Sequence, residues 1–275
     1  MRGSTPYRAS TPRRRKFGFV KLHAVDILER ERFGDHILLR YRWTGTPPEP
    51  GQFVMVRTAG ALRALDPFLS RPFFVHDYHD EVLSLLFKIR GRGTSLLSEE
   101  DAGLLVSAPL GRGFTVEDKE PVVLVGGGVW VAPLKLLSRF LYKRGVQHDV
   151  FLEIPGNSPE EYGDLISENY QGAALIPTDG SPASPEVVIS RIGDLARYRT
   201  VYASGSAEIL TAVKTACEGA IPAQLALRGR MACANGSCYG CAVPVRQSGE
   251  LGYARACIEG PVFPAESVLS IRGEE

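Results

Sequence analysis

Residues 121–134 read Pro-Val-Val-Leu-Val-Gly-Gly-Gly-Val-Trp-Val-Ala-Pro-Leu, and this stretch decides the fold class. Residues 122–125 form a short apolar run of the kind that predicts a buried parallel strand. Three glycines follow, and Leu134, Leu137 and Leu141 then recur at helical spacing. A strand, a glycine turn and a helix in this order indicate one unit of a doubly wound α/β fold.

The alternation of apolar strands and helical segments continues beyond this unit. Strands are predicted at 150–154, 173–176, 201–203 and 223–227, and helices near 159–170, 184–192 and 207–218. We therefore predict a doubly wound parallel α/β domain of the nucleotide-binding type over residues 117–222.

The chain before residue 117 has a different pattern. Short runs rich in Val, Ile, Leu, Phe and Tyr, separated by turn signals, predict strands at 19–28, 36–43, 52–58, 73–79 and 82–89. They predict an antiparallel β-barrel domain over residues 17–116, in a multidomain protein of mixed α+β class. Residues 94–100 could add one short helix, with Thr94 as its N-cap.

Charge and hydropathy exclude several classes of protein. The 275 residues carry 32 basic and 31 acidic side chains, a net charge of +1, so no overall field attracts nucleic acid or a membrane. The first 16 residues hold six of the basic side chains and no acid, and they predict a flexible basic arm on a body of net charge −5 (26 minus 31). The longest nearly apolar run, 122–134, is too short to span a membrane.

Four of the five cysteines fall close to the C-terminus. Cys233, Cys238 and Cys241 form the pattern CxxxxCxxC, and Cys257 follows after fifteen residues. This is the plant-type spacing of [2Fe-2S] ligands. The alternative is a structural zinc site with four cysteines, although such sites usually pair two CxxC knuckles. No secretory signal indicates an oxidising compartment, so disulfides are not expected.

The segment around these cysteines is rich in glycine and has no room for a large core. We predict a small iron-sulfur lobe over residues 223–275, organised by its cofactor. Cys217 stands apart in a helical segment and is interpreted as a small buried hydrophobe without a ligand role.

Three further motifs could bind phosphate groups. Gly126, Gly127 and Gly128 lie between a strand and a helix, where a dinucleotide pyrophosphate can meet unpaired amides. The same glycines could instead serve only a tight turn, and Trp130 occupies space that a dinucleotide would need. Arg71 and the segment Arg92-Gly93-Thr94 could hold a pyrophosphate by charge and by amides at a helix start, or could be a surface cation and a turn.

The order of these motifs resembles the ferredoxin-NADP reductase superfamily. Within it the sequence is similar to the electron-transfer subunits of type B dihydroorotate dehydrogenase, in unbroken order over about residues 17–268. The resemblance rests on the motifs above together with Ser70-Arg71-Pro72-Phe73, Pro50-Gly51-Gln52-Phe53, Pro109-Leu110-Gly111-Arg112-Gly113-Phe114 and Cys257-Ile258-Glu259-Gly260-Pro261-Val262-Phe263.

The resemblance implies cofactors and the residues that hold them. FAD would lie against the barrel, at Arg71, Pro72, Phe73, Phe74, Leu86, Phe87, Lys88, Gly93 and Thr94. The four clustered cysteines would hold [2Fe-2S]. NAD(H) or NADP(H) would lie over the α/β domain near Gly126 to Gly128, Asp179-Gly180-Ser181 and Ser204-Gly205.

Two positions depart from the family pattern. The family has Ser or Thr, which can reach the flavin N5 edge, where this chain has Phe74, so we expect an altered flavin potential or reactivity but retained FAD binding. The family usually has Gly where this chain has Trp130, which puts nicotinamide binding in question. Glu153, at a predicted strand end, favours NADH over NADPH.

The resemblance implies a cytoplasmic electron-transfer flavoprotein of pyrimidine biosynthesis, an oxidoreductase subunit without a catalytic acid, base or nucleophile of its own. Its partner would be an FMN-containing dihydroorotate dehydrogenase subunit, with no membrane or nucleic acid involved. Two alternatives stay open. One is an FAD and [2Fe-2S] carrier that has lost nicotinamide binding, and the other is a zinc-stabilised module whose basic arm binds nucleic acid.

Overall fold

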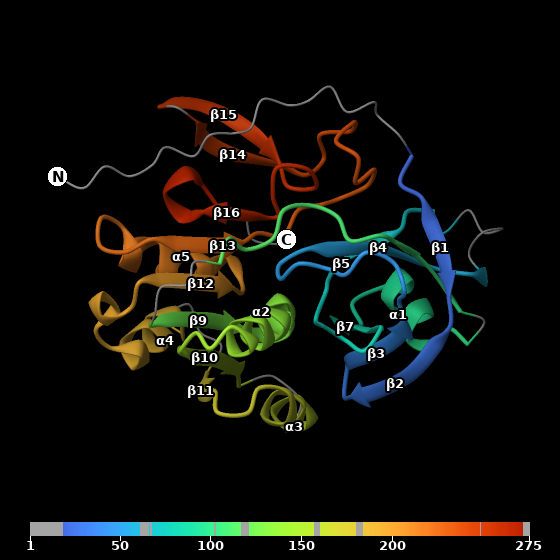
Figure 1. The fold of residues 1–275 in the computed structure, drawn as a ribbon, viewed down its shortest axis with the longest axis horizontal. Coiled ribbons are helices and arrows are strands. Elements are labelled where there is room, and N and C mark those ends of the chain that lie inside the picture. The colour runs from blue at the N-terminus through green and yellow to red at the C-terminus, as the bar shows by residue number, and fades with distance from the viewer. Residues whose placement is uncertain are drawn as a thin grey trace.

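The structure is a computed structural model that describes residues 19–60, 66, 68–101, 103–116, 121–156, 160–179, 184–247 and 249–271. The predicted basic arm at 1–16 lies outside the described residues. Figure 1 shows three parts in contact with one another: a β-rich part containing β1 to β8, an α/β part around β9 to β13, and a small C-terminal part containing β14 and β15.

The N-terminal part consists of two four-stranded antiparallel sheets, as expected for a barrel-like domain. The first sheet has the order β1 (Leu22–Val25), β8 (Leu104–Ser107), β4 (Phe53–Thr58) and β5 (Arg71–Phe74). The second has the order β2 (Ile27–Phe33), β3 (His36–Arg42), β7 (Val82–Lys88) and β6 (Asp77–His79). Alternate side chains of these strands fill a buried apolar core between the sheets.

The short helix α1 (Arg92–Glu99) of this part starts two residues earlier than predicted. Gly91 is its N-cap residue, and Thr94 lies inside the first turn. The Thr94 hydroxyl oxygen accepts hydrogen bonds from the amides of Arg90 and Gly91, at 2.9 and 3.2 Å. Thr94 therefore satisfies amides before the helix rather than capping it from the N-cap position, and that prediction was wrong.

The second part is the doubly wound α/β domain predicted from the glycine turn. Its sheet has the order β11 (Ala174–Thr178), β10 (His148–Pro155), β9 (Val122–Gly127), β12 (Thr200–Ser204), β13 (Ala223–Ala226) and β16 (Val262–Pro264), and only β16 is antiparallel to its neighbour. The helices are α2 (Ala132–Lys143), α3 (Glu160–Asn169), α4 (Ser184–Ile192) and α5 (Ala207–Cys217), with short 3-10 turns at Gly128–Val131 and Leu195–Arg197.

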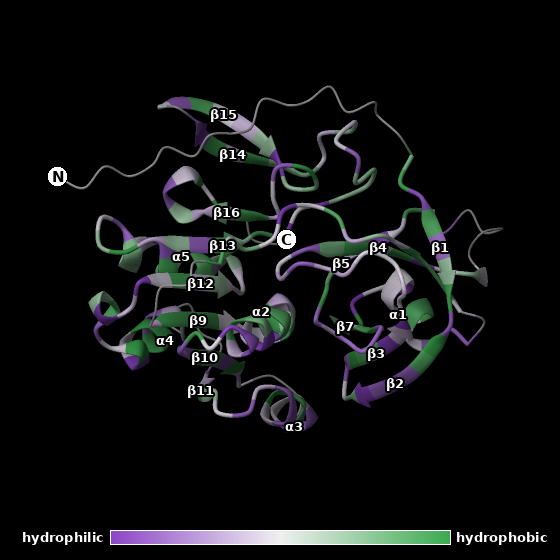
Figure 2. Cartoon of the chain, in the orientation of Figure 1, coloured by the Kyte–Doolittle hydropathy of each residue, from purple (hydrophilic) through white to green (hydrophobic). Residues whose placement is uncertain are grey.

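The central strand β9 is buried on both faces, which explains its unbroken apolar sequence. Val122 and Leu124 pack with α2 and α3 on one face, and Val123 and Val125 pack with α4 and α5 on the other. In Figure 2 β9 is green along its length, whereas the edge strand β2 is largely purple. Leu134, Leu137 and Leu141 of α2 are fully buried, as their spacing predicted.

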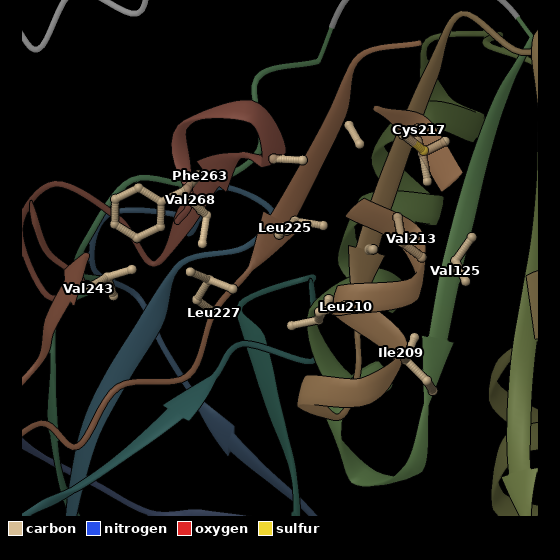
Figure 3. Packing of buried hydrophobic residues seen from close by; sticks show 14 of the residues in the cluster. Val125, Ile209, Leu210, Val213, Cys217, Leu225, Leu227, Val243, Phe263 and Val268 are labelled. Carbon is tan, nitrogen blue, oxygen red and sulfur yellow. The ribbon is translucent and has the colours of Figure 1, made fainter. Parts of the chain in front are cut away.

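The third part contains a two-stranded hairpin, β14 (Ala242–Gln247) and β15 (Glu250–Arg255), and a 3-10 turn at Ala265–Ser267. One apolar core joins it to the α/β domain, because Val243 of β14 and Val268, after the 3-10 turn, belong to the same buried cluster as Leu225 of β13 and Leu210 of α5 (Figure 3). Since β13 and β16 belong to the α/β sheet, the predicted boundary at residue 223 falls inside that sheet.

The motifs that contain Gly51, Gly111 and Gly260 lie where the parts meet. A side chain at Gly51 would meet Phe114 and Val262, and one at Gly111 would meet the carbonyl of Gly260 at 2.6 Å. The Phe114 amide donates to the Pro50 carbonyl at 2.8 Å. These contacts hold the barrel, its exit segment and the end of the C-terminal part together. No helix among the described residues is long and apolar enough to cross a membrane.

Candidate cofactor sites

The four clustered cysteines lie together as two pairs. The Sγ atoms of Cys241 and Cys257 are 3.3 Å apart. Cys233 Sγ accepts the amide of Cys238 at 3.4 Å, and the two side chains also share a hydrogen bond. The structure therefore places the four residues that the spacing predicted as ligands in two close pairs, Cys233 with Cys238 and Cys241 with Cys257.

The loop that carries the first three cysteines is fixed by its backbone and by one arginine. Gly236 has a φ of +84°, and a side chain there would meet Ile258 at 3.0 Å and Arg255 at 3.1 Å. Arg255 donates to the Gly236 carbonyl at 3.2 Å and forms an ion pair with Glu259 at 2.7 Å. The segment after Cys257 thus supports the loop that contains the other cysteines.

Hydrogen bonds favour the thiolate forms of Cys233 and Cys241. Burial alone would raise the pKa of Cys233, but the amides of Cys238, Asn235 and Ser237 outweigh it and lower that pKa to about 7. A hydrogen bond from Cys257 lowers the pKa of Cys241 to about 6, and the same shared proton raises the pKa of Cys257. Thiolates are the form of cysteine that binds metal.

This donor set fits a two-iron cluster better than one zinc ion. In a [2Fe-2S] cluster four cysteines serve two irons, whereas a structural zinc needs all four around one ion. Among the residues that the structure describes, no three His, Cys, Asp or Glu side chains converge closely enough to hold a single ion. Cys238 is exposed while Cys241 and Cys257 are buried, so one pair faces solvent and the other faces the core.

The predicted FAD residues of the barrel form a cationic site at the start of α1. A side chain at Gly93 would lie 2.5 Å from Nε and 2.6 Å from an Nη atom of Arg71, so only glycine lets the guanidinium lie across the helix start. Arg71 also donates to the Leu69 carbonyl. A fixed cation beside a helix N-terminus matches the charge of a pyrophosphate, which is the fit required of the FAD site.

The other predicted FAD residues divide between two faces of the barrel strands. Phe74 and Leu86 point toward the α/β domain and pack against its core. Phe73 and Phe87 point the other way, and their rings meet in the barrel core with ring centres 5.0 Å apart. Pro72 and Lys88 are half-buried, and Lys88 forms an ion pair with Asp35 at 3.0 Å.

The glycine turn at the end of β9 is packed against the chain itself. A side chain at Gly126 would meet the Ser204 carbonyl at 2.8 Å, and one at Gly127 would meet Glu153 Oε2 and Ile209 Cδ1 at 2.5 Å. These two glycines are therefore explained by close internal packing. Gly128 has a φ of +56° and begins a 3-10 turn, and α2 starts only at Ala132.

Trp130, which follows this turn, contacts two arginines through its ring. The Arg228 guanidinium carbon lies 3.3 Å from the centre of the Trp130 ring, and that of Arg90 lies 5.3 Å from it. Arg90 follows β7 of the barrel, and Arg228 follows β13 and leads into the cysteine loop. The sequence indicates that Trp130 is unusual, but it does not predict a role for either arginine. No local pattern connects positions that lie so far apart in the chain.

Glu153 lies under the same turn. It is 8% exposed and accepts a hydrogen bond from Thr178 Oγ1 at 2.9 Å. Burial raises the pKa of Glu153, with a further contribution from Glu208. Its carboxylate is thus engaged inside the protein rather than presented to a ribose. Asp179 is described, whereas Gly180 and Ser181 lie outside the described residues.

Comparisons with known proteins agree on one family. Residues 229–269, which contain all four clustered cysteines, match the model described as the iron-sulfur cluster binding domain of dihydroorotate dehydrogenase B. A protein of Caldanaerobacter subterraneus named dihydroorotate dehydrogenase B (NAD(+)), electron transfer subunit, is 32% identical over 253 residues, 88% of this chain and 96% of the relative. A Bacillus velezensis protein of the same name is 33% identical, over 80% of this chain and 87% of its own.

Solved structures agree on the fold. The NADH-dependent reduced ferredoxin-NADP oxidoreductase superposes with a TM-score of 0.73 at 23% identity, over 90% of both chains. Phthalate dioxygenase reductase superposes with a TM-score of 0.60 at 14% identity, over 90% of this chain and 96% of its own. The order of barrel, α/β domain and iron-sulfur segment is therefore that of a reductase fold.

Proposed function

The chain belongs to the family of dihydroorotate dehydrogenase B electron transfer subunits, and from this premise we propose that it passes electrons between a nicotinamide dinucleotide, FAD and a [2Fe-2S] cluster. The electrons go to or come from a catalytic dihydroorotate dehydrogenase subunit, with which this chain forms a hetero-oligomer. The protein is thus an oxidoreductase subunit of pyrimidine biosynthesis.

The observation that carries the proposal is the pairing of four thiol groups in a chain that also has the Arg71 site. Cys233 and Cys238 would hold one iron, and Cys241 and Cys257 would hold the other. The exposed Cys238 gives the cluster an edge at the protein surface, which suits electron transfer to another protein. A [2Fe-2S] cluster supplies one-electron transfer at a potential tuned by hydrogen bonds to its sulfurs.

The barrel residues would bind and orient FAD. Arg71 and the amides after Gly93 would hold the pyrophosphate, while Phe74 and Leu86 would form an apolar wall facing the α/β domain. When bound, FAD exchanges electron pairs with a nicotinamide and single electrons with the cluster. The chain itself excludes water at this wall and places a cation where the phosphates need it, and no acid or base is required of it.

The proposal includes an organisation along the chain. Residues 17–116 form the FAD domain, and residues 117–226 together with β16 form the nucleotide-type domain. The residues from 227 onward that lie outside β16 form the cluster lobe. Free thiols that serve as metal ligands are typical of a reducing compartment, which supports a cytoplasmic location.

A second candidate function is favoured by Trp130. If the indole above the glycine turn excludes a dinucleotide altogether, the chain would carry electrons only between proteins, through FAD and the cluster. The reconstituted chain can decide between the two, because only the first candidate is reduced directly by NADH or NADPH.

The proposed function is tested by co-purification and electron transfer with a catalytic dihydroorotate dehydrogenase subunit. We expect a stable complex in which dihydroorotate reduces both the flavin of this chain and its cluster under anaerobic conditions. A complex that forms normally, with FAD and cluster loaded, but leaves both oxidised when dihydroorotate is added would contradict it.

A further inference from the structure

We propose that Trp130 controls nicotinamide access: its indole, stacked on Arg228, covers the glycine turn, and a nicotinamide dinucleotide must displace it to bind. The inference rests on the proposed function, since it concerns the donor site of the same electron path. It assigns roles to three residues, Trp130, Arg228 and Arg90, that together form what we call the indole cover.

The backbone beneath the indole cover is held in place. Ser204 Oγ donates to the Trp130 carbonyl at 2.5 Å, and Tyr162 Oη donates to the Gly128 carbonyl at 2.6 Å. Both donors are on buried side chains that belong to other elements of the α/β domain. These hydrogen bonds anchor the turn from two sides, so the movement that the proposal requires is rotation of the Trp130 side chain.

Two of the three glycines are closely packed against the chain itself. The positions where Gly126 and Gly127 would carry side chains are taken by the Ser204 carbonyl, Ile209 and Glu153. Gly128 differs, because the nearest atom to its side-chain position is Trp130 Cδ1 at 3.8 Å. A ligand that approaches the turn therefore meets the indole first, at Gly128, and can occupy only the space that the indole leaves.

Contacts with the two arginines stabilise the position of the indole without fixing it permanently. Arg228 lies face-on to the ring at 3.3 Å and Arg90 is at 5.3 Å. A cation stacked on an indole stabilises its position by an amount that corresponds to roughly 3- to 30-fold in an equilibrium constant. Loss of the ring should therefore strengthen dinucleotide binding by a factor of this order, and loss of Arg228 should strengthen it by less.

The arginines also have a use once the indole moves. Arg90 and Arg228 bring two positive charges to the edge of the turn, and a pyrophosphate carries two negative charges in the same place. The two guanidinium groups would then leave the indole ring and bind the phosphates. This predicts that Arg228→Gln, which loosens the cover but removes one phosphate contact, gives a smaller gain in affinity than Trp130→Ala.

The test is NAD+ binding to the oxidised, FAD- and cluster-loaded protein, measured by isothermal titration calorimetry without turnover. We expect Trp130→Ala to bind NAD+ roughly 10-fold more tightly than the wild type. Arg228→Gln should change affinity by less, and Trp130→Phe should stay close to the wild type because a ring remains. Tyr142→Ala removes an 81% exposed aromatic ring from α2 and serves as the control with unchanged affinity.

Equal or weaker binding by Trp130→Ala would overturn the inference, and so would the absence of binding by both proteins. Flavin absorbance, iron and acid-labile sulfide are measured on the same samples. If the cofactors are present and both proteins bind NAD+ equally, the result counts against the indole cover alone. If the cofactors are present and neither protein binds NAD+, the result also counts against nicotinamide use and favours the carrier candidate. If reconstituted wild-type protein holds neither cofactor, the proposed function fails and the inference fails with it.

Discussion

The Sγ atoms of Cys241 and Cys257 lie 3.3 Å apart although the two residues belong to different segments of the C-terminal part. Cys241 ends the cysteine loop, and Cys257 follows β15. Both side chains are buried, and the segment between them folds as the β14 and β15 hairpin. The hairpin is therefore the element that returns the last ligand to the other three.

Replacement of Cys257 by Ser should abolish the cluster and leave the flavin. The variant keeps a side chain of similar size but offers a hydroxyl, a much poorer iron ligand than a thiolate. We expect iron and acid-labile sulfide to fall to near zero while FAD content stays close to the wild-type value. Cys217→Ala is the matched control, because Cys217 is buried in α5 away from the other cysteines, and its iron content should not change.

Gly93→Ala should weaken FAD binding. The new methyl group would lie 2.5 Å from Arg71 Nε, so the guanidinium has to leave the start of α1. A displaced charge-assisted contact corresponds to roughly a 10-fold loss of affinity. The dissociation constant of FAD, followed by recovery of free-flavin fluorescence, measures the effect.

Gly91→Ala is the control for that substitution. It lies in the same turn, has an extended backbone, and a side chain there meets nothing within 4 Å. Its FAD affinity should match the wild type. If both alanine variants lose affinity equally, the contact between Arg71 and Gly93 is not what holds the cofactor.

Asp77→Asn should destabilise the contact between the barrel and the α/β domain. Asp77 of β6 accepts two hydrogen bonds from Arg139 of α2, at 2.7 and 2.5 Å. Arg139 holds the pKa of Asp77 below its usual value although burial opposes this. Removing one partner of a largely buried pair should lower the free energy of unfolding by about 2 to 4 kcal/mol. Urea unfolding measures it, and the exposed neighbour Asp80, changed to Asn, should have little effect.

Acid should destabilise the protein through two buried histidines. Burial lowers the pKa of His36 to about 4 and that of His76 to about 3, from 6.5 in the unfolded chain. Between these values the unfolded state binds more protons, so stability falls as pH falls below 6.5. Each histidine should lower the free energy of unfolding by about 2 kcal/mol between pH 7.5 and 5.

Substitution of the histidines separates this effect from general acid sensitivity. His76→Gln should reduce the slope of stability against pH, whatever it does to stability at pH 7.5. The exposed His79, changed to Gln, should leave the slope unaltered. A slope that is the same in all three proteins would show that the buried imidazoles do not control the acid response.

Local sequence patterns were sufficient for the central strand and the first helix of the α/β domain. Residues 122–125 and the spacing of Leu134, Leu137 and Leu141 correctly predicted β9 and α2, because burial on both faces or on one face leaves a periodic signal. The cysteine spacing predicted the four candidate ligands, which the structure places in two pairs. It did not predict which sulfurs pair, because the pairing depends on the β14 and β15 hairpin. The alternation of apolar and polar residues that would predict this hairpin is interrupted by Pro244 and Gly252.

Contacts between residues that are distant in the chain could not be predicted from local sequence patterns. The motifs placed Arg71 and Gly93 in one candidate FAD site but did not predict that the two residues touch. No pattern connected Trp130 with Arg90 or Arg228. Glu153 illustrates the same limit: its place at a strand end suggested a ribose ligand, but the fold turns its carboxylate onto Thr178 and Gly127. Long-range packing decides such cases.

The central claim is that one chain couples a two-electron flavin to a one-electron cluster, and an anaerobic reductive titration of the reconstituted protein tests it most directly. Reducing equivalents are added stepwise while flavin and cluster absorbance are recorded. We expect the wild-type chain to take up about three electrons, two by FAD and one by the cluster. The cluster signal should be absent from the Cys257→Ser variant. Uptake of only two electrons by the wild type, with no spectral change beyond that of the flavin, would contradict it.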